Sequence, residues 1–257
     1  MRYLLLSAAV VALWSADAAR AAEITLIAPG GFRAAVEQMI PAFERQTGHK
    51  VKATIGSGGG TKERVVKGEV FDVPVVQPPL APVLASGHVV KESEMLLANV
   101  WVGMAVKAGA PRPDISTADA VRRTLLAAKS IAYPNVEGSP AGGAAGVSMN
   151  ETLQRLGIAD AMKPKIKGAP NGAGAMAMTA KGDVELGFTY ISEIITEPGI
   201  DLVGPLPKDA STPTGLVGFV HAHSKEPAAA KALLAYLAGP EAAKVYKERG
   251  MEPGPSR

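Results

Sequence analysis

The chain has 257 residues, of which 47% are hydrophobic and 20% are charged, and its formal net charge is +3. This length and composition are typical of a globular α/β protein with one or two domains and a sizeable core. The basic residues are scattered without a dense run, which argues against a nucleic-acid partner. Because the sequence has no cysteine, disulfides and a lipid-modified N-terminal cysteine are both excluded.

Residues 1–21 have the three parts of a secretory signal peptide. Arg2 supplies the positive start, and Leu4–Trp14 is an apolar segment too short to span a bilayer. Ala19-Arg20-Ala21 is a small-residue cleavage site, so we expect cleavage before Ala22. These features predict export of the mature chain to the bacterial periplasm.

The first part of the mature chain alternates strands and helices. Pro41, inside the first predicted helix, is expected to kink that helix or to start a second segment. The order of elements predicts a parallel sheet with helices on both of its faces. The predicted elements are a strand over 23–28, a helix over 32–47 ended by Gly48, a strand over 50–55, a helix over 61–67, a strand over 70–76 and a short helix ending at Gly87.

A second α/β series follows, and we expect it to be inserted within the first. We place the first crossing in the loop that carries Gly109 and Pro111, after a strand over 99–107, and the return crossing in a strand over 214–222. This predicts one lobe made of residues 22–107 and 214–257 and a second lobe made of residues 108–213. The other predicted elements are helices over 117–129, 145–156, 172–181, 226–238 and 240–249, and strands over 130–133, 186–190 and 201–205.

A glycine cluster, residues 56–60, lies between the second strand and the next helix. Glycine lets the backbone turn sharply and approach a ligand, and the first N–H groups of a helix have no partner within it. The positive end of the helix dipole adds to this, so the turn predicts a cradle for a small anion. We place Ser57, Gly58, Thr61 and Lys62 in this candidate site, with hydroxyl donors from Ser57 and Thr61. A flexible turn without a ligand is the alternative.

The second series carries similar turns. A glycine-rich loop over 138–146 opens one helix, and Asn171-Gly172 opens another. In open α/β sheets a ligand lies beyond the carboxyl ends of the strands. Cradles after strands in both lobes would therefore face each other across a cleft that a hinge can close.

Four segments of the chain resemble the periplasmic solute-binding proteins of type II fold, in particular the molybdate-binding branch of ABC importers. The similarity covers nearly the whole mature chain. It implies two lobes, each a mostly parallel sheet flanked by helices, joined by two crossing segments. It also implies that the protein carries a small anion to an inner-membrane permease, and we expect a monomer with no cofactor and no metal. The segments that carry the resemblance are Pro41–Val51, Gly56–Gly59, Val184–Ser192 and Ala229–Gly250.

The resemblance also implies which residues contact the anion. Ser57 matches a serine of the second strand–helix turn, and Tyr190 matches a tyrosine whose hydroxyl points into the cleft. The loop with Gly143 and the turn at Asn171 match segments that supply backbone donors from the second lobe. Where molybdate binders carry a serine pair in the first turn, this chain has Gly30 and Gly31, which leave more room and one hydroxyl donor fewer.

Basic residues near the cradles widen the choice of ligand. Arg33, Lys62 and Arg64 suit a small carboxylate at least as well as a molybdate-like oxyanion. Exposed, solvated charge is the alternative role for these side chains.

Members that resemble this subgroup act as aconitate isomerases, which shift a proton next to a carboxylate of a tricarboxylate. This is the alternative function, and it needs a positioned base such as Lys62, Tyr190 or a histidine. Glu137, Glu151 and Glu193 form no spaced pair typical of acid–base catalysis. His221 and His223 share a strand face but are too few for a closed metal site.

Overall fold

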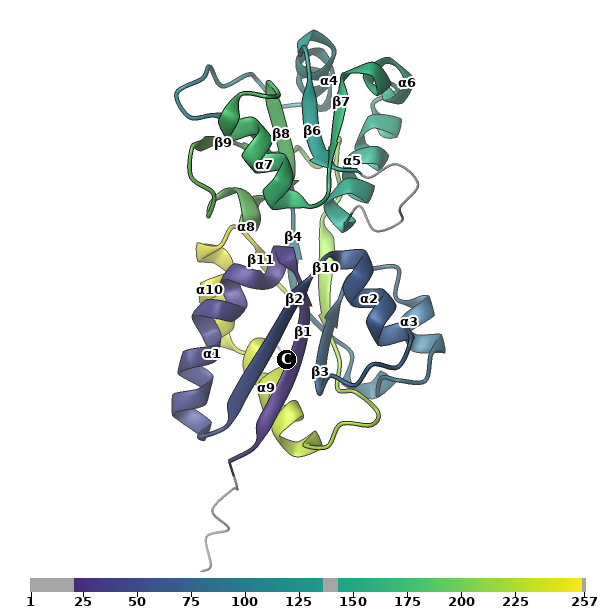
Figure 1. Ribbon diagram of the computed structural model, residues 1–257, viewed down its shortest axis with the longest axis vertical. Coiled ribbons are helices and arrows are strands. Elements are labelled where there is room, and N and C mark those ends of the chain that lie inside the picture. The colour runs from purple at the N-terminus through teal and green to yellow at the C-terminus, as the bar shows by residue number, and fades with distance from the viewer. Residues whose placement is uncertain (1–20, 136–142, 256–257) are drawn as a thin grey trace, which may run out of the picture.

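The computed structural model describes residues 21–135 and 143–255. Within them the chain forms two mixed sheets flanked by helices, and these follow one another along the long axis of the molecule (Figure 1). We call the six-stranded sheet with its helices lobe 1, and the five-stranded sheet with its helices lobe 2. The predicted signal peptide lies outside the described residues except for Ala21, and so does most of the glycine-rich loop over 138–146.

Lobe 1 is the lower half of the molecule in Figure 1, and its strands follow the order β11-β4-β10-β3-β1-β2. Strand β1 pairs in parallel with β2 and β3, so the carboxyl ends of these strands meet at one edge, with Pro29 opposite Gly56. The elements are β1 Glu23–Pro29, η1 Gly30–Phe32, α1 Arg33–Thr47, β2 Lys50–Gly56, α2 Gly58–Val66, β3 Val73–Val76, α3 Ala81–Ala85, η2 Lys91–Ser93, β4 Met95–Val100, β10 Thr214–Gly218, α9 Pro227–Leu237, α10 Pro240–Glu248 and β11 Glu252–Pro253.

Lobe 2 has the strand order β7-β6-β8-β5-β9. Strand β6 pairs in parallel with β7 and β8, and Pro134 lies opposite Ala169 where the first two of these strands end. The elements are β5 Val102–Lys107, α4 Ala118–Ala127, β6 Ile131–Pro134, α5 Ala144–Arg155, α6 Ala159–Met162, η3 Lys163–Lys165, β7 Ile166–Ala169, α7 Gly172–Lys181, β8 Leu186–Tyr190, α8 Ile191–Ile194 and β9 Ile200–Pro205.

The chain leaves lobe 1 earlier than the sequence predicted. The expected strand over 99–107 is divided between β4 in the first sheet and β5 in the second, so the crossing lies at Trp101 and not in the loop after Lys107. The alternating valines continue across this point, so no turn signal marks it. The return strand β10 lies in the first sheet, next to β4. The residue limits of the lobes otherwise remain a prediction.

Two further details differ from the expectations. Both sheets are mixed, because β4 and β10 pair in antiparallel fashion and β5 is antiparallel to β8 and β9. Pro41 lies inside the single helix α1, which ends at Gly48 in the left-handed conformation, as the stop signal predicted.

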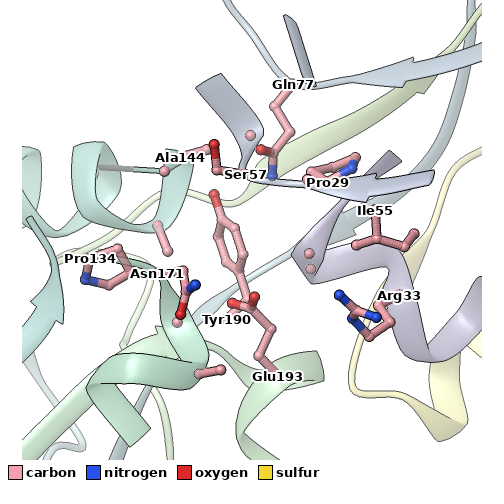
Figure 2. Close-up of a pocket in the computed structure, with 18 of the residues that line it drawn as sticks. Pro29, Arg33, Ile55, Ser57, Gln77, Pro134, Ala144, Asn171, Tyr190 and Glu193 are labelled. Atoms are coloured by element: carbon pink, nitrogen blue, oxygen red, sulfur yellow. The ribbon is translucent and has the colours of Figure 1, made fainter. Parts of the chain in front are cut away.

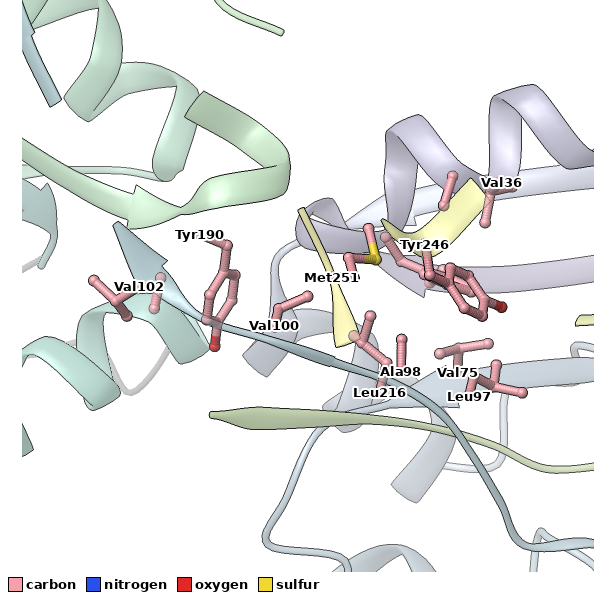
Figure 3. Close-up of a cluster of buried hydrophobic side chains, with 14 of the residues drawn as sticks. Val36, Val75, Leu97, Ala98, Val100, Val102, Tyr190, Leu216, Tyr246 and Met251 are labelled. Atoms are coloured by element: carbon pink, nitrogen blue, oxygen red, sulfur yellow. The ribbon is translucent and has the colours of Figure 1, made fainter. Parts of the chain in front are cut away.

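One apolar core extends through both lobes. In lobe 1 it includes Val36 and Tyr246, and it continues along β4 through Val100 to Val102 and the ring of Tyr190 (Figure 3). The extended segment that crosses between the lobes is therefore packed on apolar side chains. This packing fixes the position of the Tyr190 ring where the lobes meet. No helix among residues 21–135 and 143–255 is both long and apolar enough to cross a membrane.

Candidate functional site

A cleft of about 270 Å³ lies where the two lobes meet, at the carboxyl ends of their parallel strands. Lobe 1 lines it with the turns after β1 and β2, and lobe 2 lines it with the start of α5 and the turn after β7 (Figure 2). The lobes approach each other closely at its rim, because a Cβ added to Gly58 would lie 3.2 Å from the Cβ of Ala144. This is the cleft that the sequence predicted from its glycine-rich turns.

Helix starts surround the cleft. The first residues of α2, α5 and α7 line it, and so do those of η1, which continues into α1. The first N–H groups of a helix have no intrahelical partner and carry a partial positive charge. Several such ends directed at one space favour a bound anion.

Two of these helices begin with a side-chain cap. The Oγ of Ser57 accepts a hydrogen bond of 3.1 Å from the N–H of Gly60, and the Oδ1 of Asn171 accepts one of 2.8 Å from the N–H of Gly174. A hydroxyl that accepts in this way keeps its own hydrogen. Ser57 can therefore cap α2 and donate to a ligand at the same time.

Two polar groups in the wall of the cleft lack partners. The hydroxyl of Tyr190 and the amide nitrogen of Gln77 are buried without a hydrogen bond among the described residues. Figure 2 shows the Tyr190 ring with its hydroxyl directed toward Ser57 and Gln77. Burial raises the pKa of the Tyr190 hydroxyl above its usual range, so this group remains a donor at neutral pH. Buried donors without partners are rare in folded proteins, and a ligand in the cleft would give them one.

Glu193 is the acidic residue of the cleft wall, at the end opposite Gln77 in Figure 2. Its Oε2 accepts a hydrogen bond from the hydroxyl of Thr189. Burial raises the pKa of this carboxyl, while the Thr189 hydroxyl acts in the opposite direction. A carboxyl that takes up a proton can donate it in a hydrogen bond to an anion.

Arg33 gives the cleft a positive charge at the end where Glu193 lies. Its side chain lines the cleft, is 57% exposed, and lies 3.5 Å from the carboxylate of Glu37. Because the pair with Glu37 is exposed, it is weak, and a buried anion could compete for the guanidinium.

Eight of the ten predicted site residues line this cleft: Gly30, Gly31, Arg33, Ser57, Gly58, Gly143, Asn171 and Tyr190. Their contact with a ligand remains a prediction. The structure places the other two elsewhere. Thr61 is buried on the inner side of α2, where its Oγ1 would be 3.0 Å from a Cβ on Gly56. Lys62 lines a neighbouring cavity of about 360 Å³ on the far side of Gly58, and burial lowers its pKa.

The sequence analysis missed Gln77 and Glu193. Gln77 follows β3 directly, so it ends a parallel strand in the same way as Pro29 and Gly56. That position could have been inferred from the strand order, had the two prolines after Gln77 not suggested an ordinary loop. Glu193 lies one helical turn after Thr189, and no sequence signal shows that α8 turns it back toward the cleft.

No group of three or more His, Cys, Asp or Glu side chains in the described part of the chain is arranged to hold a metal ion. His221 and His223 lie in lobe 1 with His88, where the three rings form a cluster. None of these histidines lines the cleft.

Fold and cleft together define a two-lobed solute-binding protein. The chain matches the model of the bacterial extracellular solute-binding protein family over residues 24–252, and it belongs to that family.

Relatives of known sequence agree with this assignment. The chain is 35% identical to an aconitate isomerase from Pseudomonas over 241 residues, which cover 91% of this chain and 89% of that protein. It is 31% identical to the molybdate-binding protein ModA of Azotobacter vinelandii over 261 residues, 95% of this chain and 97% of that protein. The structure of the periplasmic molybdate-binding protein from Azotobacter vinelandii superposes with a TM-score of 0.73 at 22% identity, covering 90% of this chain and all of that one.

Proposed function

We propose that this solute-binding protein captures a small anion in the cleft between its lobes and delivers it to an inner-membrane ABC permease. The observation that carries the proposal is the set of helix starts around a cavity whose wall holds two donors, Tyr190 and Gln77, without a partner among the described residues. Helix starts attract an anion, and the two side chains can hydrogen-bond it. Export to the periplasm, where such a protein meets its permease, is consistent with the predicted signal peptide and with the family's extracellular location.

Within the class of small anions, we propose a small organic acid. A single bound water needs about 10–15 Å³ of cavity, so about 270 Å³ exceeds what a five-atom oxyanion requires. Gly30 and Gly31 bring no hydroxyl to the cleft, and Arg33 offers the planar donor pair that matches a carboxylate. A tetrahedral oxyanion remains the other ligand to test.

The ligand can be identified by thermal stability. The mature chain is mixed with molybdate, tungstate, sulfate, phosphate and a panel of di- and tricarboxylates, and its melting temperature is measured. A ligand present at about 100 times its Kd adds about 2.7 kcal/mol to the free energy of unfolding. We expect a carboxylate to give the largest shift. A larger shift with molybdate would overturn the organic-acid assignment, and no shift with any anion would overturn the proposed function.

A second candidate is an isomerase that shifts a proton next to a carboxylate. The specific observation in its favour is Glu193, a carboxyl in the cleft wall whose pKa is raised by burial, since a proton shift next to a carboxylate needs a positioned acid or base. The Pseudomonas relative is named for this kind of activity. A carboxylate that stabilises the protein is therefore followed by proton NMR with catalytic amounts of the chain. An unchanged spectrum supports transport, whereas conversion of trans- to cis-aconitate supports the enzyme.

A further inference from the structure

The surroundings of Glu193 are unusual for a group in an anion site. Among the cleft-lining residues that the structure describes, it is the only one with an acidic side chain. Its carboxyl lies between the two lobes: a Cβ added to Gly30 would be 2.8 Å from Oε1, and one added to Gly172 would be 2.5 Å from Oε2. The group is therefore held between the start of η1 and the start of α7.

An ionised carboxylate in this place would repel the ligand. Two negative charges in a partly desolvated site disfavour each other strongly, and the usual result is that one of them takes up a proton. A neutral carboxyl has the opposite effect, because its O–H can donate a hydrogen bond to the anion.

The charged and titratable groups facing Glu193 come from three elements. Helix α1 contributes Arg33 and Glu37, which pair with each other, and Glu197 follows α8. Tyr190 ends β8 and stays neutral. Burial and Glu197 raise the pKa of the Glu193 carboxyl, whereas the Thr189 hydroxyl, the backbone N–H of Tyr190 and Arg33 lower it. The net effect raises the pKa of the Glu193 carboxyl in the free protein, and a bound anion would raise it further.

We propose that Glu193 is protonated in the ligand-bound protein and donates a hydrogen bond from Oε1 to the anion, so that binding takes up one proton. The hydrogen bond from Thr189 occupies Oε2, which leaves Oε1 for the proton. The inference rests on the proposed anion-binding function and adds the requirement that the ligand present an oxygen that accepts at this end of the cleft. It also predicts that affinity falls as pH rises, by up to about tenfold per pH unit.

The test is calorimetric titration of the full mature chain with sulfate, fumarate and trans-aconitate between about pH 6 and pH 8. Each titration is repeated in two buffers with different ionisation enthalpies, which gives the number of protons taken up. The variant Glu193→Gln carries a neutral side chain of the same shape and can still accept from Thr189. Glu197→Gln is the matched control, because it removes a nearby charge that does not line the main cleft.

For the wild type we expect proton uptake and an affinity that falls with pH. Glu193→Gln should bind within about threefold of the wild type at the lowest pH and lose both the proton uptake and the pH dependence. Glu197→Gln should keep both, with the pH dependence shifted to lower pH because a charge that raises the pKa of Glu193 is removed. A Gln variant that binds more than about tenfold more weakly at low pH would overturn the proposal. Wild-type binding without proton uptake would also overturn the proposal. If Glu193→Gln does not fold, the proton uptake of the wild type alone decides whether the proposal holds. If these three anions and the rest of the thermal-stability panel all fail to bind the wild type, the proposed function fails together with the inference.

Discussion

Ser57 has two roles that a single substitution removes together. Its hydroxyl caps α2 by accepting from Gly60, and it lines the cleft as a donor. Ser57→Ala should therefore lower the free energy of unfolding by about 1 kcal/mol through loss of the cap. It should also weaken anion binding by about 1–3 kcal/mol through loss of the donated hydrogen bond.

Thr117 provides the matched control for Ser57. Its side chain caps α4 by accepting from the N–H of Ala120, and it does not line the cleft. Thr117→Ala should cost the same stability in chemical denaturation and leave the Kd from calorimetry unchanged. Equal affinities in both variants would remove Ser57 from the binding site and leave it only as a helix cap.

A substitution at Tyr190 distinguishes an effect on binding from an effect on stability more clearly than one at Ser57. Its buried hydroxyl makes no well-formed hydrogen bond among the described residues, although the side chains of Ser148, Thr214 and Gln77 lie near it. Tyr190→Phe therefore removes a group that contributes little to the stability of the fold. The free energy of unfolding should stay the same or rise slightly. The affinity for the anion should fall by about 1–3 kcal/mol, which is about 5- to 150-fold in Kd. Unchanged affinity would mean that the hydroxyl does not contact the ligand.

At this scale the sequence was informative where a residue ends a strand or starts a helix. Ser57 was predicted from the glycine turn in which it lies, and Asn171 from the family resemblance; both cap helices that open on the cleft. Thr61 lies in the same motif, but it is one turn into α2 and faces inward. Which face of a helix is buried depends on long-range packing. For the same reason the sequence did not show that Glu193 points into the cleft, because its direction is set by the packing of α8 between the lobes.

Among the elements, α5 shows why a glycine lies in the first turn of a helix of the cleft. A Cβ added to Gly146 would lie 1.7 Å from the carbonyl oxygen of Pro134, at the end of β6. Gly146 therefore lets the start of α5 rest directly on the strand and reach the cleft. Gly146→Ala must displace the helix, which should cost about 1–3 kcal/mol or more of stability and weaken anion binding as well.

Val147, on the same helix, is the control position for Gly146. It is 53% exposed, so Val147→Ala should change the free energy of unfolding by no more than about 0.5 kcal/mol. Both variants can be measured by urea denaturation and calorimetry. If Gly146→Ala is as stable as Val147→Ala, the close packing of α5 on β6 is not needed for the fold.

The histidine cluster of lobe 1 makes stability depend on pH. The ring centroids of His88, His221 and His223 lie 5.9–6.3 Å apart, and the Nε2 of His221 is buried without a partner among the described residues. Burial lowers the pKa of His221, and the other two rings add to this, while Asp72 acts against it. The unfolded chain therefore binds a proton more readily than the folded one.

Stability from this group is fully present above the unfolded pKa of about 6.5 and is lost as pH falls through the lower pKa of the folded state. The free energy of unfolding should decrease as the solution is acidified below about pH 6.5. His221→Asn keeps an acceptor for the N–H of His223 but cannot be protonated, so it should flatten this decrease. An unchanged slope in the variant would show that another group causes the dependence.

For the molecule as a whole, the order of strands and helices gave the two-lobed architecture, because each turn after a parallel strand carries its own signal. The crossing between the lobes has no such sequence signal. Val100 and Val102 continue one alternating pattern, although they lie in different sheets. A change of sheet within an unbroken extended segment is decided by which partner strands are available, and that information is spread over the entire chain.

Closure of the lobes can be tested where they touch. Ala144, at the start of α5, faces Gly58, at the start of α2, across the rim of the cleft. A larger side chain at Ala144 would meet the backbone of α2 before the cleft closes. We expect Ala144→Leu to hold the lobes apart and to weaken anion binding by about 1–3 kcal/mol, because the donors of the two lobes could no longer reach the ligand together.

The expected readout is small-angle X-ray scattering with and without a saturating anion. The wild type should become more compact when the ligand binds, and Ala144→Leu should not. Ala144→Ser is the control, since a hydroxymethyl group adds little volume and should preserve both closure and affinity. Because Ala144 is only partly buried at the edge of the core, Ala144→Leu should unfold close to the wild-type denaturant concentration, so a loss of binding reflects the altered approach of the lobes. If Ala144→Leu compacts as much as the wild type does, the contact between α2 and α5 does not limit closure, and the ligand is held without it.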